Sequence, residues 1–324
     1  MTGSTAESRA LVDGFHPGTE ALRATREALD SMVERFPLLD ARLEDRVLRL
    51  QPESLQPFGS FKVRAALTAV DWAVQSGATR IVTASAGNFA QGLTFAARRA
   101  GLPVDVHVPD SAAAGKIAAL RGLEARVISH PFDEWWTIMC NRDTGDNGAT
   151  FVHPVAEHSV LLGNATIGLD IQTAWSEVEI VIVPFGGGGL CVGVAAALEA
   201  LGSRAEVVTS EVAGSAALSA ALAAGHPVEI QRRPSFVDGI GSTRVLDEMW
   251  PLISSCITRS IVVSVDEAAA AVRELALRHK LVVEGAGATA FAAACRPEFA
   301  GRRVAAVLSG SNIDAPTLAG ILSG

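Results

Sequence analysis

The chain has 324 residues, of which 49% are hydrophobic and 19% are charged, and its formal net charge is −8. This balance excludes an intrinsically disordered chain and argues against a general nucleic-acid partner, which would need clustered Lys and Arg. The four cysteines, Cys140, Cys191, Cys256 and Cys295, lack CxxC spacing and a nearby His pair, so neither a disulfide framework nor a zinc site is indicated.

Nothing in the sequence indicates export or a membrane partner. Residues 1–13 are polar and acidic, whereas a signal peptide would be basic and then apolar. Residues 180–198 carry no charge over the length of a membrane span, but Pro184 and four consecutive glycines interrupt them. This interruption predicts a strand, a turn and a helix. We therefore expect a cytoplasmic protein.

The first half of the chain alternates predicted strands and helices. Apolar residues at helical spacing predict a helix over residues 18–36. Ser60 stands where it would cap a later helix, which carries Lys62 near its start. Strands are predicted at residues 47–50, 80–84, 104–108 and 125–128, and further helices are predicted up to Arg99 and over residues 112–121.

A loop at residues 145–148 is interpreted as a change of domain. Beyond it, strands at residues 180–183, 206–210, 261–263 and 304–308 alternate with helices at residues 165–175, 190–201, 213–223, 266–279 and 286–295. This alternation predicts an α/β fold with mostly parallel sheets and helices on both faces. We expect a large domain of residues 1–57 and 149–324 and a small mobile domain of residues 58–148, with ligands at the carboxyl ends of the strands.

The glycine run at residues 186–189 follows an apolar strand and opens a helix. Residues without Cβ let backbone N–H groups converge on an anion, and the helix N-terminus adds a favourable dipole. The dinucleotide fingerprint fails because Cys191 and Val192 stand where its third glycine is required, and no GK[ST] of a P-loop follows. A phosphate site is the interpretation we favour, and a tight turn without a ligand is the alternative.

Lys62 is the candidate catalytic residue. A lysine on a helix is most often solvated, but glycine-centred stretches follow apolar runs elsewhere, at residues 85–92, 184–190 and 308–312. Together these stretches supply what a lysine needs in order to hold an aldehyde cofactor that bears a phosphate.

Several motifs, in order along the chain, resemble the threonine/serine dehydratase group of fold-type II pyridoxal-phosphate enzymes, which have a tryptophan synthase β-like fold. They are residues 56–67, 85–92, 186–190, 238–240, 284–288 and 309–312. The likeness extends from about residue 36 to residue 314. It implies two doubly wound parallel-type α/β domains with pyridoxal 5'-phosphate in the cleft between them.

The resemblance also implies a role for each matched residue. Lys62 would hold the cofactor as a Schiff base and later act as the base for the α-proton. Ser309 would meet the pyridine nitrogen, and its neutral hydroxyl would suit β-elimination better than transamination. The remaining cofactor-binding residues would be Phe61, Asn88, Gly186, Gly187, Gly188, Gly189 and Leu190. The substrate carboxylate would lie against Ser85, Ala86, Gly87, Asn88 and Phe89, and its binding would close the small domain.

The chain departs from the family pattern near the site. Phe58 stands where Thr is frequent, Ala65 where Gly is usual, Phe89 where His is common, and Ser311 where Gly occurs. These changes alter shape and polarity without removing a catalytic group, so they bear on the substrate more than on the reaction. The pair Trp135 and Trp136 is also unusual, and packing is favoured over recognition as its role.

Three acidic residues leave alternatives open. Asp238 is interpreted as part of a turn that brings backbone near the cofactor, with general acid as the alternative. Glu284 either lines the site or caps the helix that follows it. Glu211 stands where some relatives bind a divalent cation, but no second carboxylate follows it, so we expect no metal there.

The sequence thus indicates an ammonia-lyase that eliminates water from a threonine-like or serine-like β-hydroxy amino acid and yields a 2-oxo acid and ammonia. A β-replacement enzyme and a catalytically impaired cofactor-binding homologue are the alternatives. In racemases of this family a serine stands at the position of Ala86 and donates a proton on the face opposite the lysine. An alanine methyl group cannot donate a proton, so the resemblance implies little racemisation. We also expect the protein to form a homo-oligomer, a dimer. Its ligand should be a small amino acid and not a nucleic acid.

Overall fold

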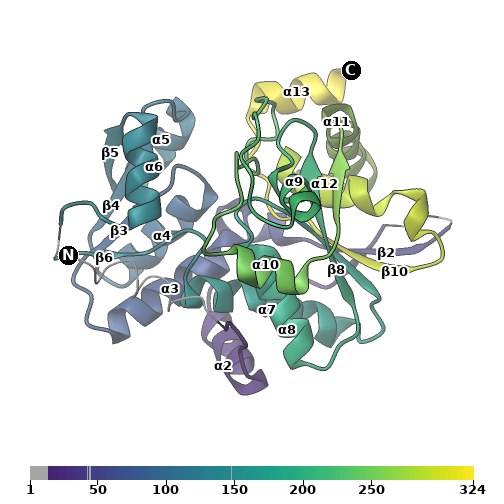
Figure 1. Cartoon of the computed structure of the whole chain (residues 1–324), viewed down its shortest axis with the longest axis horizontal. Coiled ribbons are helices and arrows are strands. Elements are labelled where there is room, and N and C mark those ends of the chain that lie inside the picture. Colours follow the sequence, from purple (N-terminus) through teal and green to yellow (C-terminus); the bar gives the residue numbers. More distant parts are fainter. Residues whose placement is uncertain (1–13, 42, 44, 147) are drawn as a thin grey trace.

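Two β-sheets, each covered by helices, organise the chain (Figure 1). The structure is a computed structural model that describes residues 14–41, 43, 45–146 and 148–324. The four-stranded sheet and its helices, the smaller region, lie on the left of Figure 1, and the six-stranded sheet and its helices, the larger region, lie on the right. The expected α/β class is confirmed, whereas the polar segment 1–13 lies outside the described residues.

The larger sheet has the strand order β1-β2-β10-β7-β8-β9, and every neighbouring pair is parallel except β1 with β2. Its strands are β1 Leu39–Asp40, β2 Val47–Gln51, β7 Ile180–Pro184, β8 Glu206–Val212, β9 Ser260–Val263 and β10 Arg303–Val307. Successive side chains of β7 face opposite sides of the sheet, as expected for a strand. Val181 and Val183 belong to one apolar core, and Ile180 and Ile182 belong to another.

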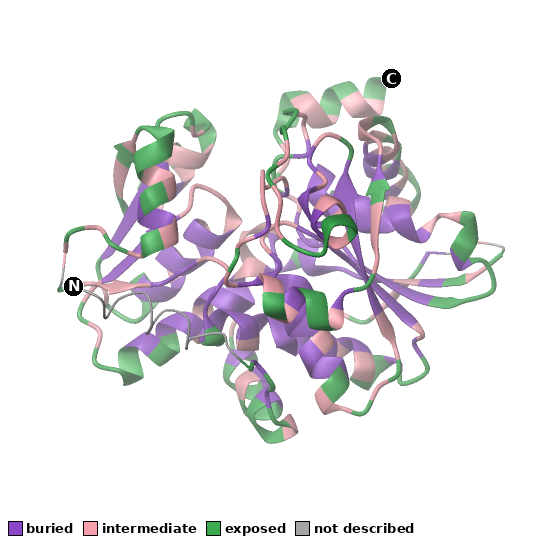
Figure 2. Ribbon diagram, in the orientation of Figure 1, coloured by how far each residue is buried: buried purple, intermediate pink, exposed green. Residues whose placement is uncertain are grey.

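Helices cover both faces of the larger sheet, and Figure 2 shows the strands between them as buried. One core includes residues of α7 (His158–Ala174) and α8 (Gly189–Ala200). The other includes residues of α11 (Val265–Glu274) and α12 (Gly285–Ala294). This sandwich explains why strand β7 is apolar throughout, since neither of its faces meets water.

The smaller sheet has the order β5-β4-β3-β6, and all its pairs are parallel. Its strands are β3 Ile81–Ala84, β4 Val104–Pro109, β5 Arg126–His130 and β6 Thr150–Phe151, and its helices are α4 Asn88–Arg99, α5 Ala114–Gly122 and α6 Phe132–Asn141. Ile138 and Met139 of α6 pack with Ala84 on one face. The edge strand β5 is only partly buried, so this region is covered less completely than the larger one.

Strand β6 changes the expected boundary between the domains. Thr150 pairs with Ile81, so residues 150–151 complete the smaller sheet, although the sequence placed residues from 149 onward in the large domain. Helix α3 (Lys62–Gln75) lies against α4 and also against α7 of the larger region. Gly163 permits this close contact, because a Cβ there would lie 2.7 Å from the Cα of Ala65. The helix that carries Lys62 is therefore shared by both regions.

Several local predictions are adjusted by the structure. The helix expected over residues 18–36 is α2, Thr19–Leu29, and turns follow it. Phe61, not Ser60, is the N-cap of α3, but the Ser60 Oγ accepts the Lys62 N–H at 3.3 Å. The remaining elements are η1 Glu53–Leu55, η2 Pro57–Gly59, α9 Ala217–Ala224, α10 Trp250–Cys256, η3 Leu275–His279, η4 Pro297–Phe299 and α13 Ala315–Ser323.

A buried ionic network fixes the start of α3 to the larger region. Arg64 and Glu53 are both fully buried, and the Arg64 Nη2 lies 2.8 Å from the Glu53 Oε1. The Arg64 Nη1 also donates to the Asp170 Oδ2 at 2.8 Å, and the Arg26 Nε donates to the Asp170 Oδ1 at 2.9 Å. Bidentate pairs of this kind restrict orientation as well as distance. Lys62, two residues before Arg64, is thereby held in place.

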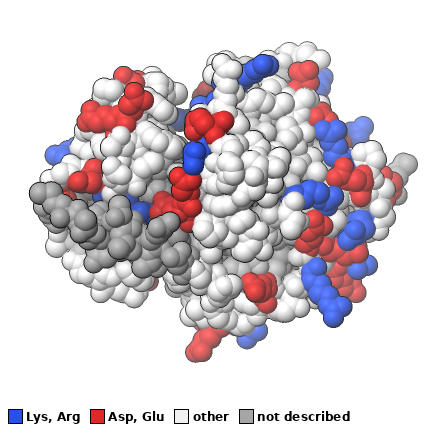
Figure 3. Space-filling view, viewed as in Figure 1, with Lys and Arg blue, Asp and Glu red and all other residues white. Residues whose placement is uncertain are grey.

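Residues 180–198 form β7, the glycine loop and most of α8, which confirms the prediction of a strand, a turn and a helix. In the part of the chain that is described, no helix is both long and apolar enough to cross a membrane. On the face shown in Figure 3, acidic and basic side chains are interspersed along the larger region. A single basic surface for nucleic acid is not seen on this face.

Candidate active site

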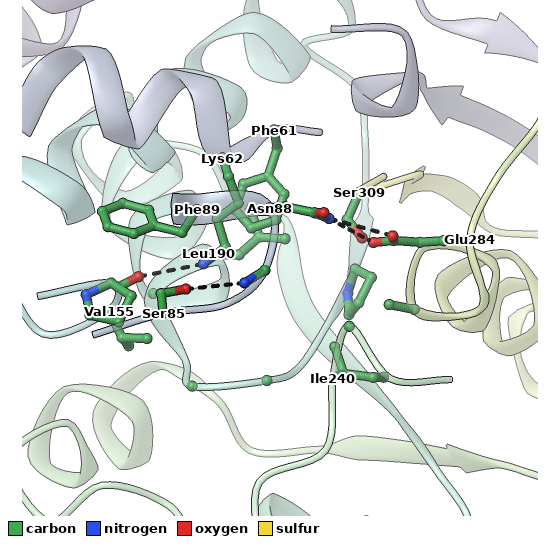
Figure 4. Close-up of a pocket in the computed structure, with 18 of the residues that line it drawn as sticks. Phe61, Lys62, Ser85, Asn88, Phe89, Val155, Leu190, Ile240, Glu284 and Ser309 are labelled. Atoms are coloured by element: carbon green, nitrogen blue, oxygen red, sulfur yellow. Dashed lines mark hydrogen bonds between the residues drawn. The ribbon is translucent and has the colours of Figure 1, made fainter. Parts of the chain in front are cut away.

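A cavity of about 240 Å³ lies where several parallel strands end. Its walls come from the segments after β3, β7 and β10, together with the start of α3. The carboxyl ends of parallel strands are the usual ligand-binding edge of such sheets. Figure 4 shows that Lys62, Asn88, Ser309 and Glu284 all surround this space.

Lys62 reaches into the cavity from the first turn of α3. Its Nζ donates to the Pro154 carbonyl at 3.4 Å and lies 5.0 Å from the centre of the Phe61 ring and 5.7 Å from that of Phe89. Removal from water lowers the pKa of the Lys62 amine from 10.5 to about 8. At pH 7 roughly a tenth of this amine is therefore neutral and nucleophilic, far more than for an ordinary lysine.

A strained turn aims α3 at the cavity. Phe58 and Gly59 both have positive φ, 60° and 62°. Phe58 is a bulky residue, for which this conformation is unusual. Its carbonyl accepts a hydrogen bond from the Asn312 Nδ2 at 2.8 Å, and the Gly59 carbonyl accepts one from the Ser311 N–H at 2.8 Å. The segment after β10 thus holds the turn that precedes Lys62.

The glycine loop between β7 and α8 forms the floor of the cavity. Gly188 has φ of 96°, and a Cβ there would lie 2.5 Å from the Ile253 Cδ1. A Cβ on Gly187 would lie 2.6 Å from the Val155 Cγ2. Because the first N–H groups of α8 have no partner within the helix, this floor offers donors to an anion. The closely packed glycines bring the chain near that anion.

Asn88 and Glu284 form the opposite wall. The Asn88 Nδ2 donates to the Glu284 Oε1 at 3.1 Å, and the Asn88 Oδ1 accepts from the Asn312 Nδ2 at 2.8 Å. Burial raises the pKa of the Glu284 carboxyl from 4.5 to about 7, while the hydrogen bond from Asn88 opposes this effect. Glu284 is the N-cap residue of α12 without a side-chain cap bond, and it lines the cavity, so the first of its two expected roles is the one observed.

Ser309 follows β10 and also lines the cavity. Its carbonyl accepts hydrogen bonds from the Phe61 N–H at 3.1 Å and from the Ser60 Oγ at 3.3 Å. These two bonds tie Ser309 to the turn that carries Lys62. A neutral hydroxyl therefore lies on the same cavity as the lysine amine, as the sequence led us to expect.

The segment after β3 brings most of the expected substrate residues to the cavity. Ser85, Gly87, Asn88 and Phe89 line it, whereas Ala86 lines an adjoining cavity instead. The Ser85 Oγ accepts the Gly87 N–H at 3.5 Å. A Cβ on Gly87 would meet nothing within 4 Å, so this loop borders open space.

The structure adds residues that the sequence did not reveal. Lys116 lines the cavity from α5, and its Nζ lies 2.6 Å from the Asp238 Oδ2 of the larger region. Asp238 is thus an ion-pair partner, and Asp238, Gly239 and Ile240 all line the cavity. Val155 is the other unexpected lining residue. No local pattern marks these residues, because the two regions meet only in the folded chain.

His153 and Glu211 both have structural roles. The His153 Nδ1 accepts the N–H groups of Val155 and Ala156, and burial keeps the pKa of this histidine well below its ordinary value. Neutral His153 therefore shapes the segment whose Pro154 carbonyl meets Lys62. The Glu211 carboxylate accepts hydrogen bonds from the Leu218 and Ser219 N–H groups and from the hydroxyls of Ser219 and Ser260. Among the described residues, no cluster of His, Cys, Asp and Glu could hold a metal ion.

These features fit an aldehyde cofactor that bears a phosphate. The packed glycines leave room for an anion at the start of α8, and the amine of Lys62 lies on the same cavity. The Ser309 hydroxyl and the Asn88 amide supply hydrogen bonds for a polar ring. The donor set therefore matches the phosphate, the aldehyde and the ring of pyridoxal phosphate.

Comparison with known proteins also indicates a pyridoxal-phosphate enzyme. A family model described as pyridoxal-phosphate dependent enzyme matches residues 25–310. The chain is 34% identical over 303 residues to L-threonine ammonia-lyase of Thermotoga maritima, and the match covers 91% of this chain and 75% of that protein. It is 32% identical over 313 residues to phenylserine dehydratase of Ralstonia pickettii, with coverage of 94% and 95%.

Other relatives differ in length or in reaction. The chain is 33% identical to the biosynthetic L-threonine dehydratase of Escherichia coli but spans only 62% of its length. The solved threonine deaminase isoform 2 of Solanum lycopersicum has a TM-score of 0.82 and 25% identity, and the match covers 97% of this chain and 96% of that one. Maize serine racemase, at 24% identity and a TM-score of 0.86, shares the fold. The chain therefore belongs to the pyridoxal-phosphate dependent enzyme family and has the fold-type II architecture.

Proposed function

We propose that this protein is a pyridoxal-phosphate-dependent ammonia-lyase that acts on a β-hydroxy amino acid. The observation that carries the proposal is the Lys62 amine, which has a lowered pKa and shares one cavity with the glycine loop and the Ser309 hydroxyl. The relatives named as threonine ammonia-lyase and dehydratase support the same reaction. In this reaction the β-hydroxyl leaves as water, and the resulting enamine tautomerises and takes up water to give a 2-oxo acid and ammonium.

Lys62 has two tasks in this proposal. When bound, pyridoxal phosphate supplies an aldehyde that captures amines and a ring that accepts electrons from the substrate Cα. At rest, the Lys62 Nζ holds that aldehyde; when free, its lone pair takes the proton from Cα. A pKa of about 8 suits the second task, because a base works best when its pKa lies near the working pH.

The other cavity residues position the two ligands. We assign the phosphate to Gly186, Gly187, Gly188, Gly189 and Leu190, and the faces and edges of the ring to Phe61, Asn88 and Ser309. We assign the substrate carboxylate to the loop from Ser85 to Phe89, whose open side borders the cavity. A neutral Ser309 hydroxyl leaves the ring nitrogen unprotonated, and the weaker electron sink favours elimination over transamination.

The assembly and location also follow from the proposal. We propose that the smaller region closes over the bound substrate, since residues of both regions line the cavity. We further propose a homodimer in the cytoplasm.

The experiment is an assay of 2-oxo acid released by purified holoenzyme from β-hydroxy amino acids, with no added nucleophile. We expect release of 2-oxo acid and ammonium in equal amounts. Formation of product only after a thiol or amine is added would assign β-replacement instead, and cofactor binding without any product would assign a catalytically impaired homologue.

Racemisation is the second reaction that the structural likeness raises, since a serine racemase shares the fold. It needs a proton donor on the face of Cα opposite Lys62. The methyl group of Ala86 cannot donate a proton, and Ala86 does not line the main cavity. Chiral analysis beside the 2-oxo acid assay should show slow inversion, and Ala86→Ser should raise inversion relative to elimination. D-amino acid formed as fast as 2-oxo acid would contradict the lyase assignment.

A further inference from the structure

A second cavity of about 500 Å³ adjoins the candidate active site. The two cavities share a wall that includes Ser85, Gly87, Val155 and Ile240. A molecule bound at the Ser85–Phe89 loop therefore borders directly on the second cavity. None of the roles assigned above uses this space.

The lining of the second cavity is largely apolar, and helix α6 supplies its largest side chains. Trp135, Trp136 and Met139 come from this helix, and Leu246 comes from the larger region. Trp135 and Trp136 have ring centroids 6.2 Å apart, and both pack with Leu246 around the buried Met139. Smaller apolar residues also line it: Ala84, Ala86, Pro109, Ala112, Ala113, Pro154, Val155 and Ile240. Ser85, Ser111 and Ser242 are polar members of the same lining.

The ring of Trp135 is fixed. Its Nε1 donates to the carbonyl of His107 in β4 at 3.1 Å, so the indole N–H needs no ligand. Met139 lies one helical turn beyond Trp135, which places both on one face of α6. The tryptophan pair packs as the sequence analysis predicted, and both residues also line the second cavity.

Lys116, Asp238 and Arg232 are the charged residues that line the second cavity. Lys116 lines both cavities, but the Asp238 carboxylate lies 2.6 Å from its Nζ and balances its charge. Arg232 is the other cation of the lining, and it is exposed to solvent. A charged substituent packed against Trp135, Trp136 and Met139 would lie among apolar groups, which is unfavourable. Arg232 offers an acidic substituent a solvent-exposed partner, and 3-hydroxyaspartate tests that alternative.

We propose that the second cavity binds the side chain of the substrate, and that this side chain is a large apolar group, an aromatic ring on the β-carbon. This inference rests on the proposed lyase function and names its substrate class. A dry apolar cavity of about 150 Å³ already suffices to bind benzene, so the volume here accommodates a phenyl ring. A methyl group or hydrogen, as in threonine or serine, would leave most of that space unfilled.

The test compares kcat/KM of the holoenzyme for β-phenylserine, threonine, serine and 3-hydroxyaspartate by 2-oxo acid release. Apolar pockets discriminate by about tenfold or more for each added group that they accommodate. We expect kcat/KM for phenylserine to exceed that for threonine by at least about tenfold. Equal or higher values for threonine or serine, or a preference for 3-hydroxyaspartate, would overturn the inference while leaving the lyase function intact.

A matched pair of variants locates the effect on α6. Trp136→Ala removes a ring that lines the cavity, whereas Phe132→Ala removes a half-exposed ring of the same helix that stacks on Trp136 and lies outside the cavity lining. We expect Trp136→Ala to lower kcat/KM for phenylserine about tenfold more than for threonine, and Phe132→Ala to lower both alike. Equal losses for both substrates in Trp136→Ala would contradict the inference.

A binding measurement separates this inference from the proposed reaction. L-Phenylalanine and L-alanine carry no β-hydroxyl, so neither can undergo elimination of water. Calorimetry on the holoenzyme should show tighter binding of L-phenylalanine by at least about tenfold, even if no amino acid is turned over. Equal affinity would overturn the inference whatever the assays of 2-oxo acid show.

Discussion

The two glycine-containing loops of the active site look alike in sequence but differ in the folded chain. Both follow an apolar strand and precede a helix. In the larger region, Cβ atoms on Gly187 and Gly188 would lie 2.6 Å and 2.5 Å from neighbouring side chains. In the smaller region, a Cβ on Gly87 would meet nothing within 4 Å. A packed loop suits a resident cofactor, and an open loop suits a substrate that enters and leaves.

The same contrast holds for charged groups. In the larger region, Arg64 and Glu53 form an ion pair without access to water. In the smaller region, Asp105 pairs with Arg126, whose side chain is 66% exposed. We infer that the larger region is the preformed half of the site and that the smaller region adapts to the substrate.

The largest effect is expected from breaking the buried network. Glu53→Gln leaves the buried Arg64 without one of its two carboxylates, and an uncompensated buried charge costs about 3–5 kcal/mol. Asp105→Asn in the smaller region should cost less, about 1–3 kcal/mol, because Asp105 is buried but its partner Arg126 is 66% exposed. Urea unfolding of both variants measures the difference. Equal losses of unfolding free energy in the two variants would show that ion pairs stabilise the two regions to the same extent.

A pH-dependent effect is expected from Glu157, the buried N-cap residue of α7. Burial raises the pKa of its carboxyl from 4.5 to about 7, although hydrogen bonds from the His153 N–H and the Ser159 hydroxyl oppose this. The stability that comes with the raised pKa is present below pH 4.5 and is lost as the pH rises through 7.

Glu157→Gln removes this titration. Relative to the wild type, the variant should gain up to about 3 kcal/mol in unfolding free energy between pH 5 and pH 8. Comparison of the two proteins at each pH cancels the other groups that titrate in this range, including Glu284. A constant difference across the pH range would mean that Glu157 is not buried as the structure shows.

Substitution in the two loops gives the most direct contrast between them. Gly187→Ala places a methyl group against Val155, and such overpacking costs about 1–3 kcal/mol. We expect the Kd for pyridoxal phosphate to rise, because the loop must shift away from Val155 and its N–H groups then no longer converge on the phosphate. Gly87→Ala should leave this Kd unchanged and raise the KM for substrate. Cofactor titration by absorbance, together with steady-state kinetics, measures both, and the reverse pattern would exchange the roles of the loops.

The smallest effect is expected from the ion pair between the regions. Lys116 and Asp238 are 30% and 50% exposed, and such pairs contribute about 0–1 kcal/mol. Lys116→Ala should therefore lower the unfolding free energy by less than about 1 kcal/mol, and 1 M salt should reduce that difference further. A loss several times larger would mean that this pair, rather than packing, holds the two regions together.

The fold was predictable because its signals are local. The apolar run of β7 and the glycines after it predicted a strand, a turn and a helix, and the structure confirms this. Ordered motifs predicted the family, which the comparisons confirm. The place of β6 was not predictable, because two residues carry no pattern that distinguishes one sheet from the other.

The candidate site was predictable in part. Lys62, Asn88, Ser309 and the glycine loop lie on one cavity as expected, while their roles stay predictions. Lys116 and the α6 tryptophans were not assigned to it, since their positions depend on how the two regions meet. For Trp135 and Trp136 the sequence favoured packing over substrate recognition. Both residues also line the second cavity, which no sequence pattern indicated.

The most direct test of the central claim is the site of covalent attachment. Holoenzyme reduced with borohydride and digested should yield one peptide that carries the reduced cofactor on Lys62. In parallel, Lys62→Ala should lower kcat for 2-oxo acid release by about 100-fold to 10,000-fold or more, as loss of a catalytic base does. An adduct on Lys116 or Lys280, or a Lys62→Ala variant with normal turnover, would contradict the account.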